Sequence, residues 1–169
     1  MTTFSRWPAA LLSGFLLATV FIAGCAHPIS ANSPNEADHS AWTGRISLQV
    51  HGEPPQAFFA GFELRGNPVQ GELTLNSPLG TNLAVLRWSP QEAVLDSGNQ
   101  LQRFASVDEL IEKATGASVP LPALFDWLGG KKTAADGWSA DLSQQAEGRL
   151  SAVRTTPQPR ADLRIVLDR

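Results

Sequence analysis

Three places in this 169-residue sequence carry side chains that could do chemistry. The only cysteine, Cys25, follows two small residues, where its thiolate would be an accessible nucleophile for a modifying enzyme. His51 could act as a base, but it lies in a Gly/Pro turn without a nucleophile-elbow or zinc-helix motif. The adjacent carboxylates of Asp108 and Glu109 are explained by helix capping. The sequence therefore predicts a modified cysteine and no enzyme, with no catalytic residue, metal site or cofactor.

Composition and charge exclude other classes of protein. There are 13 Lys and Arg against 16 Asp and Glu, a net charge of −3 with no basic stripe, which argues against a nucleic-acid surface. One cysteine excludes a disulfide framework within the chain and a cysteine-based zinc site. The length fits one domain, and no internal period is present. We expect a monomer.

The segment Ile22-Ala23-Gly24-Cys25 resembles the bacterial lipobox, an apolar residue and two small ones before a cysteine. The resemblance implies that residues 1–24 are a cleaved lipoprotein signal peptide and that Cys25 is acylated. Residues 9–24 carry no charge and would span about 24 Å as a helix, short of the roughly 30 Å hydrocarbon core. A transmembrane anchor is the alternative. The residue after Cys25 is Ala26 rather than Asp, which resembles the arrangement in lipoproteins that are sorted to the outer membrane.

The residues after Cys25 have the composition of a tether. Residues 25–41 contain two prolines, His27 and His39, and almost no apolar side chain, so they cannot bury enough surface to order themselves. We expect the acylated cysteine and a flexible linker at 25–41, followed by a folded domain at 42–169.

Strand-like patterns dominate the expected domain. Apolar and polar residues alternate over 44–50 and 58–65, as in strands with one buried face. Shorter apolar stretches follow at a spacing of about ten residues, which is typical of an antiparallel meander. They lie at 73–75, 83–88, 93–95, 150–153 and 163–167.

Two helices are expected between these strands. Ser106 and Glu109 form a capping box, and Gly116 stands where the helix should end. The second helix, over 120–129, carries an apolar stripe at helical spacing and is closed by a Gly-Gly pair. The order of strands, two helices and strands predicts an α+β fold.

Several short motifs, in their order and spacing, resemble the LolB family. They are Trp42-x-Gly44-Arg45, Phe59-Ala60-Gly61-Phe62, Leu73-x-Leu75-x-Ser77-Pro78-Leu79-Gly80, Trp88-Ser89-Pro90, Pro120-Leu121-Pro122, Trp127-Leu128-Gly129-Gly130 and Gly137-Trp138. The family consists of outer-membrane lipoproteins that receive acylated lipoproteins from a periplasmic carrier (LolA-like) and insert them into the outer membrane. The resemblance implies an incomplete antiparallel β-barrel of about 9–11 strands, with helices plugging one end around an apolar cavity. After Trp138 the chain departs from the family pattern and looks shortened by a hairpin or a few loops.

The implied function needs an apolar space that the chain does not fill with its own side chains, because acyl chains do not cross water unaided. Ordinary core packing is the alternative for every candidate lining residue. The candidates are Phe58, Phe62, Leu64, Leu73, Leu75, Leu86 and Trp88 from the strands, with Leu110, Phe125 and Trp127 from the helices.

Leu79 stands between Pro78 and Gly80 in a polar turn, where an exposed leucine gains nothing from folding. The resemblance implies that the apolar residue at this position touches the membrane during delivery. Burying one leucine contributes roughly 1.5–3 kcal/mol, enough to bias a loop toward lipid while the acyl chains on Cys25 supply the anchor. The alternative is that Leu79 folds back over the sheet.

The expected protein is thus anchored in the outer membrane through Cys25, with its domain facing the periplasm. Its partners would be the carrier, the acylated cargo and outer-membrane lipid. Two alternatives stay open: a lipid-binding or sensing lipoprotein without insertion activity, and a structural lipoprotein with a filled core.

Overall fold

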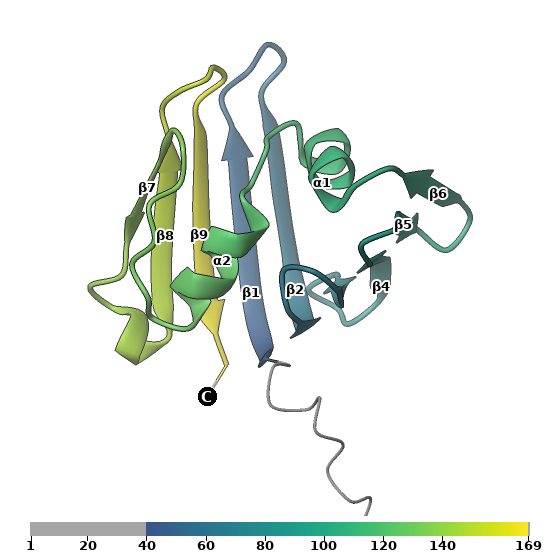
Figure 1. Cartoon of the computed structure of the whole chain (residues 1–169), viewed down its shortest axis with the longest axis horizontal. Coiled ribbons are helices and arrows are strands. Elements are labelled where there is room, and N and C mark those ends of the chain that lie inside the picture. Colours follow the sequence, from purple (N-terminus) through teal and green to yellow (C-terminus); the bar gives the residue numbers. More distant parts are fainter. Residues whose placement is uncertain (1–39, 169) are drawn as a thin grey trace, which may run out of the picture. The chain divides into compact units, whose positions relative to one another are not determined.

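The computed structural model describes residues 40–168 (Figure 1). The expected signal peptide, Cys25 and most of the expected linker lie outside the described residues. Within them, the elements are β1 Ser40–Val50, β2 Gln56–Gly66, β3 Gly71–Asn76, β4 Asn82–Trp88, β5 Ala93–Asp96, β6 Leu101–Phe104, α1 Val107–Thr115, α2 Leu121–Leu128, β7 Trp138–Asp141, the short 3-10 helix η2 Gln145–Glu147, β8 Arg149–Arg154 and β9 Ala161–Leu167. β1 thus begins at Ser40 rather than Trp42.

All the described strands belong to one antiparallel sheet in the order β6-β5-β4-β3-β2-β1-β9-β8-β7. The first and last strands pair with each other inside the sheet, and β6 and β7 form its two open edges. The prediction of an α+β fold built on an incomplete antiparallel sheet is confirmed in this form. Figure 1 shows α1 beside β5 and β6, and α2 in front of the sheet near β1 and β9.

The longest strands follow the alternation of their sequence. In β1 and β2, Leu48, Ala60 and Leu64 are buried, and each is followed or preceded by an exposed residue: Gln49, Phe59 and Arg65. Gly44 allows β9 to approach, because a Cβ on Gly44 would lie 2.1 Å from the carbonyl oxygen of Val166. The pairing of β1 with β9 therefore depends on a glycine at this position.

The capping box predicted at Ser106 is present. Ser106 Oγ accepts a hydrogen bond of 3.2 Å from the Glu109 amide, and Gly116 ends α1 in the left-handed conformation with φ 72°. α2 is different: its N-cap residue is Pro120, which offers no side-chain acceptor, and its first turn carries no acid. Only α1 therefore has a capped and charge-matched N-terminus.

Two strands were not predicted. β6 has the sequence LQRF and is mostly exposed, so it lacks a buried alternating face; its pairing with β5 makes it a strand. β7 buries only Trp138 and pairs with β8. Both are short edge strands, whose conformation comes from a neighbour more than from their own pattern.

Candidate functional site

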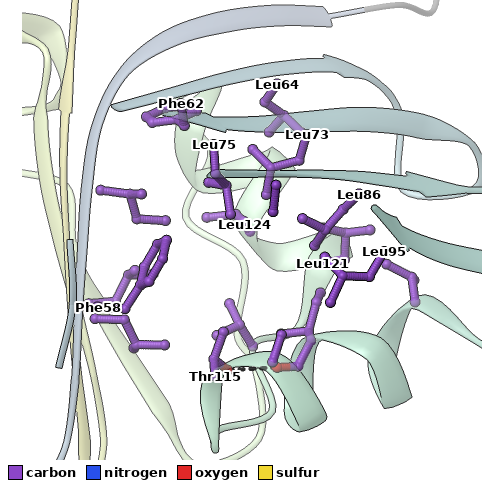
Figure 2. Close-up of a pocket in the computed structure, with 18 of the residues that line it drawn as sticks. Phe58, Phe62, Leu64, Leu73, Leu75, Leu86, Leu95, Thr115, Leu121 and Leu124 are labelled. Carbon is purple, nitrogen blue, oxygen red and sulfur yellow. Dashed lines mark hydrogen bonds between the residues drawn. The ribbon is translucent and has the colours of Figure 1, made fainter. Parts of the chain in front are cut away.

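A cavity of about 320 Å³ opens on the concave side of β1–β5, and the sheet supplies most of its wall (Figure 2). In-register pairing places Leu64, Leu73, Leu86 and Leu95 side by side on four successive strands. Directly paired residues of an antiparallel sheet point to the same face, so these four leucines form one row across the cavity wall. Phe58 and Phe62 of β2 lie on the same face.

Both helices also line the cavity. α1 contributes Val107, Ile111 and Thr115, and α2 contributes Leu121 and Leu124 (Figure 2). The α2 residues recur at helical spacing, so one face of the helix supplies them all. Two elements distant in sequence from β1–β4 thus contribute to the same cavity.

The cavity offers a ligand almost no polar contact. Every lining residue is apolar except Ser97 and Thr115. Thr115 Oγ1 lies 2.7 Å from the carbonyl oxygen of Ile111 and 2.8 Å from that of Ala117, so its single proton is held by the backbone. A cavity of this kind binds hydrocarbon through burial, at about 0.8 kcal/mol for each methylene removed from water.

Seven of the ten predicted lining residues surround the cavity: Phe58, Phe62, Leu64, Leu73, Leu75, Leu86 and Trp88. The other three lie elsewhere. Leu110 and Trp127 are fully buried, and Phe125 makes edge contacts with Trp42 at 5.4 Å and with Trp88 at 6.4 Å between ring centroids. The face of α2 that carries Leu121, Leu124 and Leu128 takes the cavity side, which turns Phe125 and Trp127 away from it.

Sequence reasoning missed the remaining lining residues. Some of them belong to patterns that the sequence shows. Ile46 and Leu48 alternate with polar residues in β1, and the apolar stripe of α2 predicts a buried face but does not say that this face borders a cavity. Others, such as Val119 in a loop, belong to no such pattern. The full set is Ile46, Leu48, Leu83, Ala84, Leu95, Ser97, Val107, Ile111, Ala114, Thr115, Val119, Leu121, Leu124, Leu128, Leu163 and Ile165.

The turn between β3 and β4 presents Leu79 with 94% of its surface exposed. Ser77 holds this turn: its amide donates to the Thr81 carbonyl at 2.8 Å, and its Oγ accepts from the amides of Leu79 and Thr81 at 3.3 and 3.1 Å. Gly80 adopts φ 82°, a left-handed conformation that suits glycine. Leu79 therefore projects outward and does not cover the sheet.

The polar groups that sequence analysis considered for catalysis have structural partners. His51 Nε2 lies 2.6 Å from Asp162 Oδ2, and Arg160 donates to Asp162 Oδ1 at 2.9 Å. The hydrogen bond from Arg160 lowers the pKa of Asp162, with a smaller contribution from His51. Within residues 40–168 no cluster of His, Cys, Asp and Glu could hold a metal ion. No helix in the same range is long and apolar enough to cross a membrane.

An open antiparallel sheet with two helices and an apolar cavity defines a class of barrel-like α+β proteins with room for an apolar ligand. Comparison with known proteins identifies the family within that class. The family model described as "Outer membrane lipoprotein LolB" matches residues 38–162. The chain therefore belongs to the LolB family of outer-membrane lipoproteins.

Individual relatives agree with the family model. The outer-membrane lipoprotein LolB of Ralstonia nicotianae is 34% identical, over 90% of this chain and 75% of the relative. That of Cupriavidus taiwanensis is 35% identical, over 88% of this chain and 73% of the relative. That of Bordetella petrii is 31% identical, over 95% of this chain and 90% of the relative.

Proposed function

We propose that this protein accepts acylated lipoproteins from a LolA-like periplasmic carrier and inserts them into the outer membrane. In this proposal, residues 1–24 are cleaved, and acylated Cys25 and the linker tether the protein to the membrane. The folded domain that follows the linker begins with β1 at Ser40. The anchor has a simple test: Cys25→Ala should move the protein from the outer-membrane fraction to the periplasmic fraction, and retention in the membrane would argue against acylation there.

The apolar cavity is the single observation that carries the proposal. It is an unfilled space of about 320 Å³ without a titratable group in its lining. Folding gains nothing from leaving such a space empty, since filling it would strengthen packing. An acyl chain of the cargo supplies the missing contacts and is shielded from water while it is held, and the helices then act as a plug at one end of the half-barrel.

Leu79 supports the second step, delivery to lipid. The hydrogen bonds of Ser77 fix the turn, so the exposed leucine costs little further ordering when it enters a membrane. Its burial contributes roughly 1.5–3 kcal/mol, too little for a standing anchor and enough to hold the turn in lipid during release. Pro78, Leu79 and Gly80 together form the proposed insertion loop.

The direction of transfer would follow affinity. Cargo would move from carrier to cavity to bilayer because each step buries its acyl chains better than the last, with no chemical energy consumed. The cavity lining makes no oriented polar contact, which favours release, since hydrocarbon held only by burial exchanges freely into a larger apolar phase.

The test uses the full acylated chain in liposomes, mixed with a carrier loaded with an acylated lipoprotein. We expect cargo to leave the carrier and become membrane-inserted. Leu79→Glu should leave cargo removal intact and slow insertion about tenfold, which is the loss of roughly 1.4 kcal/mol. Leu101→Glu is the matched control, because Leu101 is another leucine that is largely exposed, at 59%, but lies in edge strand β6.

Two results would contradict the proposal. Equal insertion by wild type and Leu79→Glu would remove the loop from the mechanism. Cargo binding with no insertion by the wild-type protein would instead indicate a lipid-binding or sensing lipoprotein on the same fold.

A further inference from the structure

Arg154, near the end of β8, is the one charged side chain that is buried within residues 40–168, with 4% of its surface exposed. No acid of the described chain lies within 4 Å of it. Other arginines show the opposite arrangement: they are exposed, and each has a carboxylate partner. These are Arg65, Arg87, Arg103, Arg149 and Arg160, with N···O distances of 3.3, 2.7, 2.6, 2.8 and 2.9 Å.

The contacts of Arg154 orient its guanidinium group without neutralising it. Nη1 donates to the carbonyl of Ser118 at 3.4 Å and Nη2 to that of Pro159 at 3.0 Å, while the group lies 5.9 Å from the ring centre of Trp138. The buried Nε atom has no hydrogen-bond partner. Two carbonyls and an aromatic face stabilise a cation only in part, and a buried charge without a counter-ion is costly.

The N-terminus of α2, which carries a partial positive charge, lies beside Arg154. A surface hollow of about 430 Å³ is lined by Arg154 and Trp138, and also by Pro120, Pro122 and Ala123 at the N-terminus of α2. This helix start has no side-chain cap and no acid in its first turn. The N-terminus of a helix carries a partial positive charge, which favours an anion. Pro120 and Pro122 have no N–H, so the donor that this helix start adds to the hollow is the Ala123 amide.

Helix α1 provides an internal comparison. Its N-terminus has the Ser106 cap and two acids, Asp108 and Glu109, so its positive end is already satisfied. The N-terminus of α2 has neither a side-chain cap nor an acid in its first turn, and Arg154 has no carboxylate partner. Asp136 is the only acid that lines the hollow, and it is exposed and forms no ion pair with Arg154.

We propose that this hollow, the Arg154 pocket, binds a phosphate group. Phosphate oxygens can accept hydrogen bonds from the Arg154 guanidinium group and from the Ala123 amide at the same time, because the lone pairs of the oxygens point in different directions. The group would come from one of two sources, phosphate in solution or the headgroup of a phospholipid at the membrane surface. This site is separate from the apolar cavity, since the two linings share no residue.

The first experiment is a titration of the ¹⁵N-labelled full chain, in neutral detergent, with inorganic phosphate at constant ionic strength. Saturable NMR shifts are expected at Arg154 Nε–H, the Ala123 amide and the Trp138 indole N–H. Arg154→Gln should weaken phosphate binding about ten- to a hundredfold, the loss of a charge-assisted hydrogen bond. Arg45→Gln is the matched control, because Arg45 is exposed and forms no ion pair within residues 40–168, and it should leave the affinity unchanged.

Three results would overturn the proposal: shifts that do not saturate, equal phosphate affinity in Arg154→Gln and wild type, or equal affinity for acetate. Asp136→Asn should tighten binding, because it removes the one negative charge that lines the hollow.

A second variant keeps the test valid if Arg154→Gln fails to fold. Pro120→Asp places a carboxylate at the N-cap of α2, where the extended backbone conformation (φ −71°, ψ 104°) suits a capping aspartate. It should raise Tm in phosphate-free buffer and abolish the rise in Tm that phosphate gives the wild type. An unchanged Tm with a retained phosphate effect would overturn the site.

The source of the phosphate is distinguished by reconstituting the full chain in two kinds of vesicle. In vesicles of a neutral glycolipid, inorganic phosphate should raise Tm. If the same rise occurs in phosphatidylglycerol vesicles, the ligand is phosphate from solution; if the rise is absent there because the site is already filled, the ligand is the headgroup. A lack of any rise in glycolipid vesicles would overturn the proposal.

Discussion

The sheet has two parts, one on each side of the β1–β9 pairing. Both parts bury apolar residues, but one part surrounds a cavity and the other is filled by its own side chains. On one side, strands β1–β6 with α1 form the cavity half, where a row of leucines leaves a space of about 320 Å³. On the other, strands β7–β9 with the loop after α2 form the packed half, where Trp127 and Trp138 lie in contact at 6.3 Å between ring centroids. α2 contributes to both halves, and so does β9, since Leu163 and Ile165 also line the cavity.

The difference lies in the side chains and in how they are held. Trp127 Nε1 donates to the Thr133 carbonyl at 2.9 Å, and Trp138 Nε1 donates to that of Ser118 at 3.1 Å. These bonds fix two large rings in the packed half. The leucines of the cavity half have no polar end to fix them and less volume to fill the space. A filled core and an unfilled one are thus built on a single sheet.

Removing the central ring of the packed half should have the largest effect. Trp127→Ala is expected to lower the free energy of unfolding by about 3–5 kcal/mol, because it leaves a cavity and removes the contact with Trp138. Urea denaturation measures the loss. Leu95→Ala, in the wall of the existing cavity, is the control and should cost less than about 2 kcal/mol, since Leu95 is only partly buried. Equal losses would contradict the distinction between the halves.

The second prediction adds volume to each half. Ala152→Phe, in the packed half, should cost about 1–3 kcal/mol or more, because Ala152 is 1% exposed and has no room for a ring. Ala84→Phe, opposite Leu75 in the cavity wall, should change stability by less than about 1 kcal/mol.

The same pair of variants reports on ligand binding. An apolar fluorescent probe should bind Ala84→Phe about tenfold more weakly than wild type, a change of roughly 1.4 kcal/mol, because the ring occupies its space. Folded Ala152→Phe should bind the probe normally. Unchanged probe affinity in Ala84→Phe would show that the probe, and by extension hydrocarbon, binds elsewhere.

The smallest effect is expected where the two halves join. Asp162 of β9 contacts His51, which follows β1, and its pKa is lowered, chiefly by Arg160. A carboxylate with a lowered pKa stabilises the folded state above its ordinary pKa of about 3.9, and this contribution is lost as the pH falls through the lowered pKa. Asp162→Asn should therefore flatten the decline of stability in acid and cost under about 1 kcal/mol at pH 7.

Thermal melts from pH 7 to pH 2 measure this dependence. Glu63→Gln is the control, because Glu63 forms an exposed ion pair with Arg65 within one strand and does not join the halves. If the Tm of Asp162→Asn falls with decreasing pH as steeply as that of the wild type, Asp162 does not stabilise the contact between the two halves.

Much of the cavity half could be predicted from the sequence, and the reason is local. Alternation in β1 and β2 and the capping box at Ser106 are short-range signals that tertiary contacts reinforce, and seven predicted residues do surround the cavity. The edge strands β6 and β7 lacked such a signal. The face of α2 turned toward the cavity could not be chosen either, because Leu124, Phe125 and Trp127 are all apolar and all buried.

The site at Arg154 was out of reach for a different reason. Its partners Ser118, Trp138 and Pro159 belong to three separate segments, and nothing in the composition distinguishes one arginine from the others. Only the fold shows that this arginine is buried while the paired ones are exposed.

The pairing of β1 with β9 also determines the order in which the sheet can be completed. Neighbouring strands from β1 to β6 are joined by short turns and can pair before the rest of the chain is present. β1 gains its second neighbour only with residues 161–167, more than a hundred residues after β1 ends. Until then an interior edge of the sheet is open to solvent. The edge of β1 that β9 covers is therefore the last interior edge of the sheet to be protected.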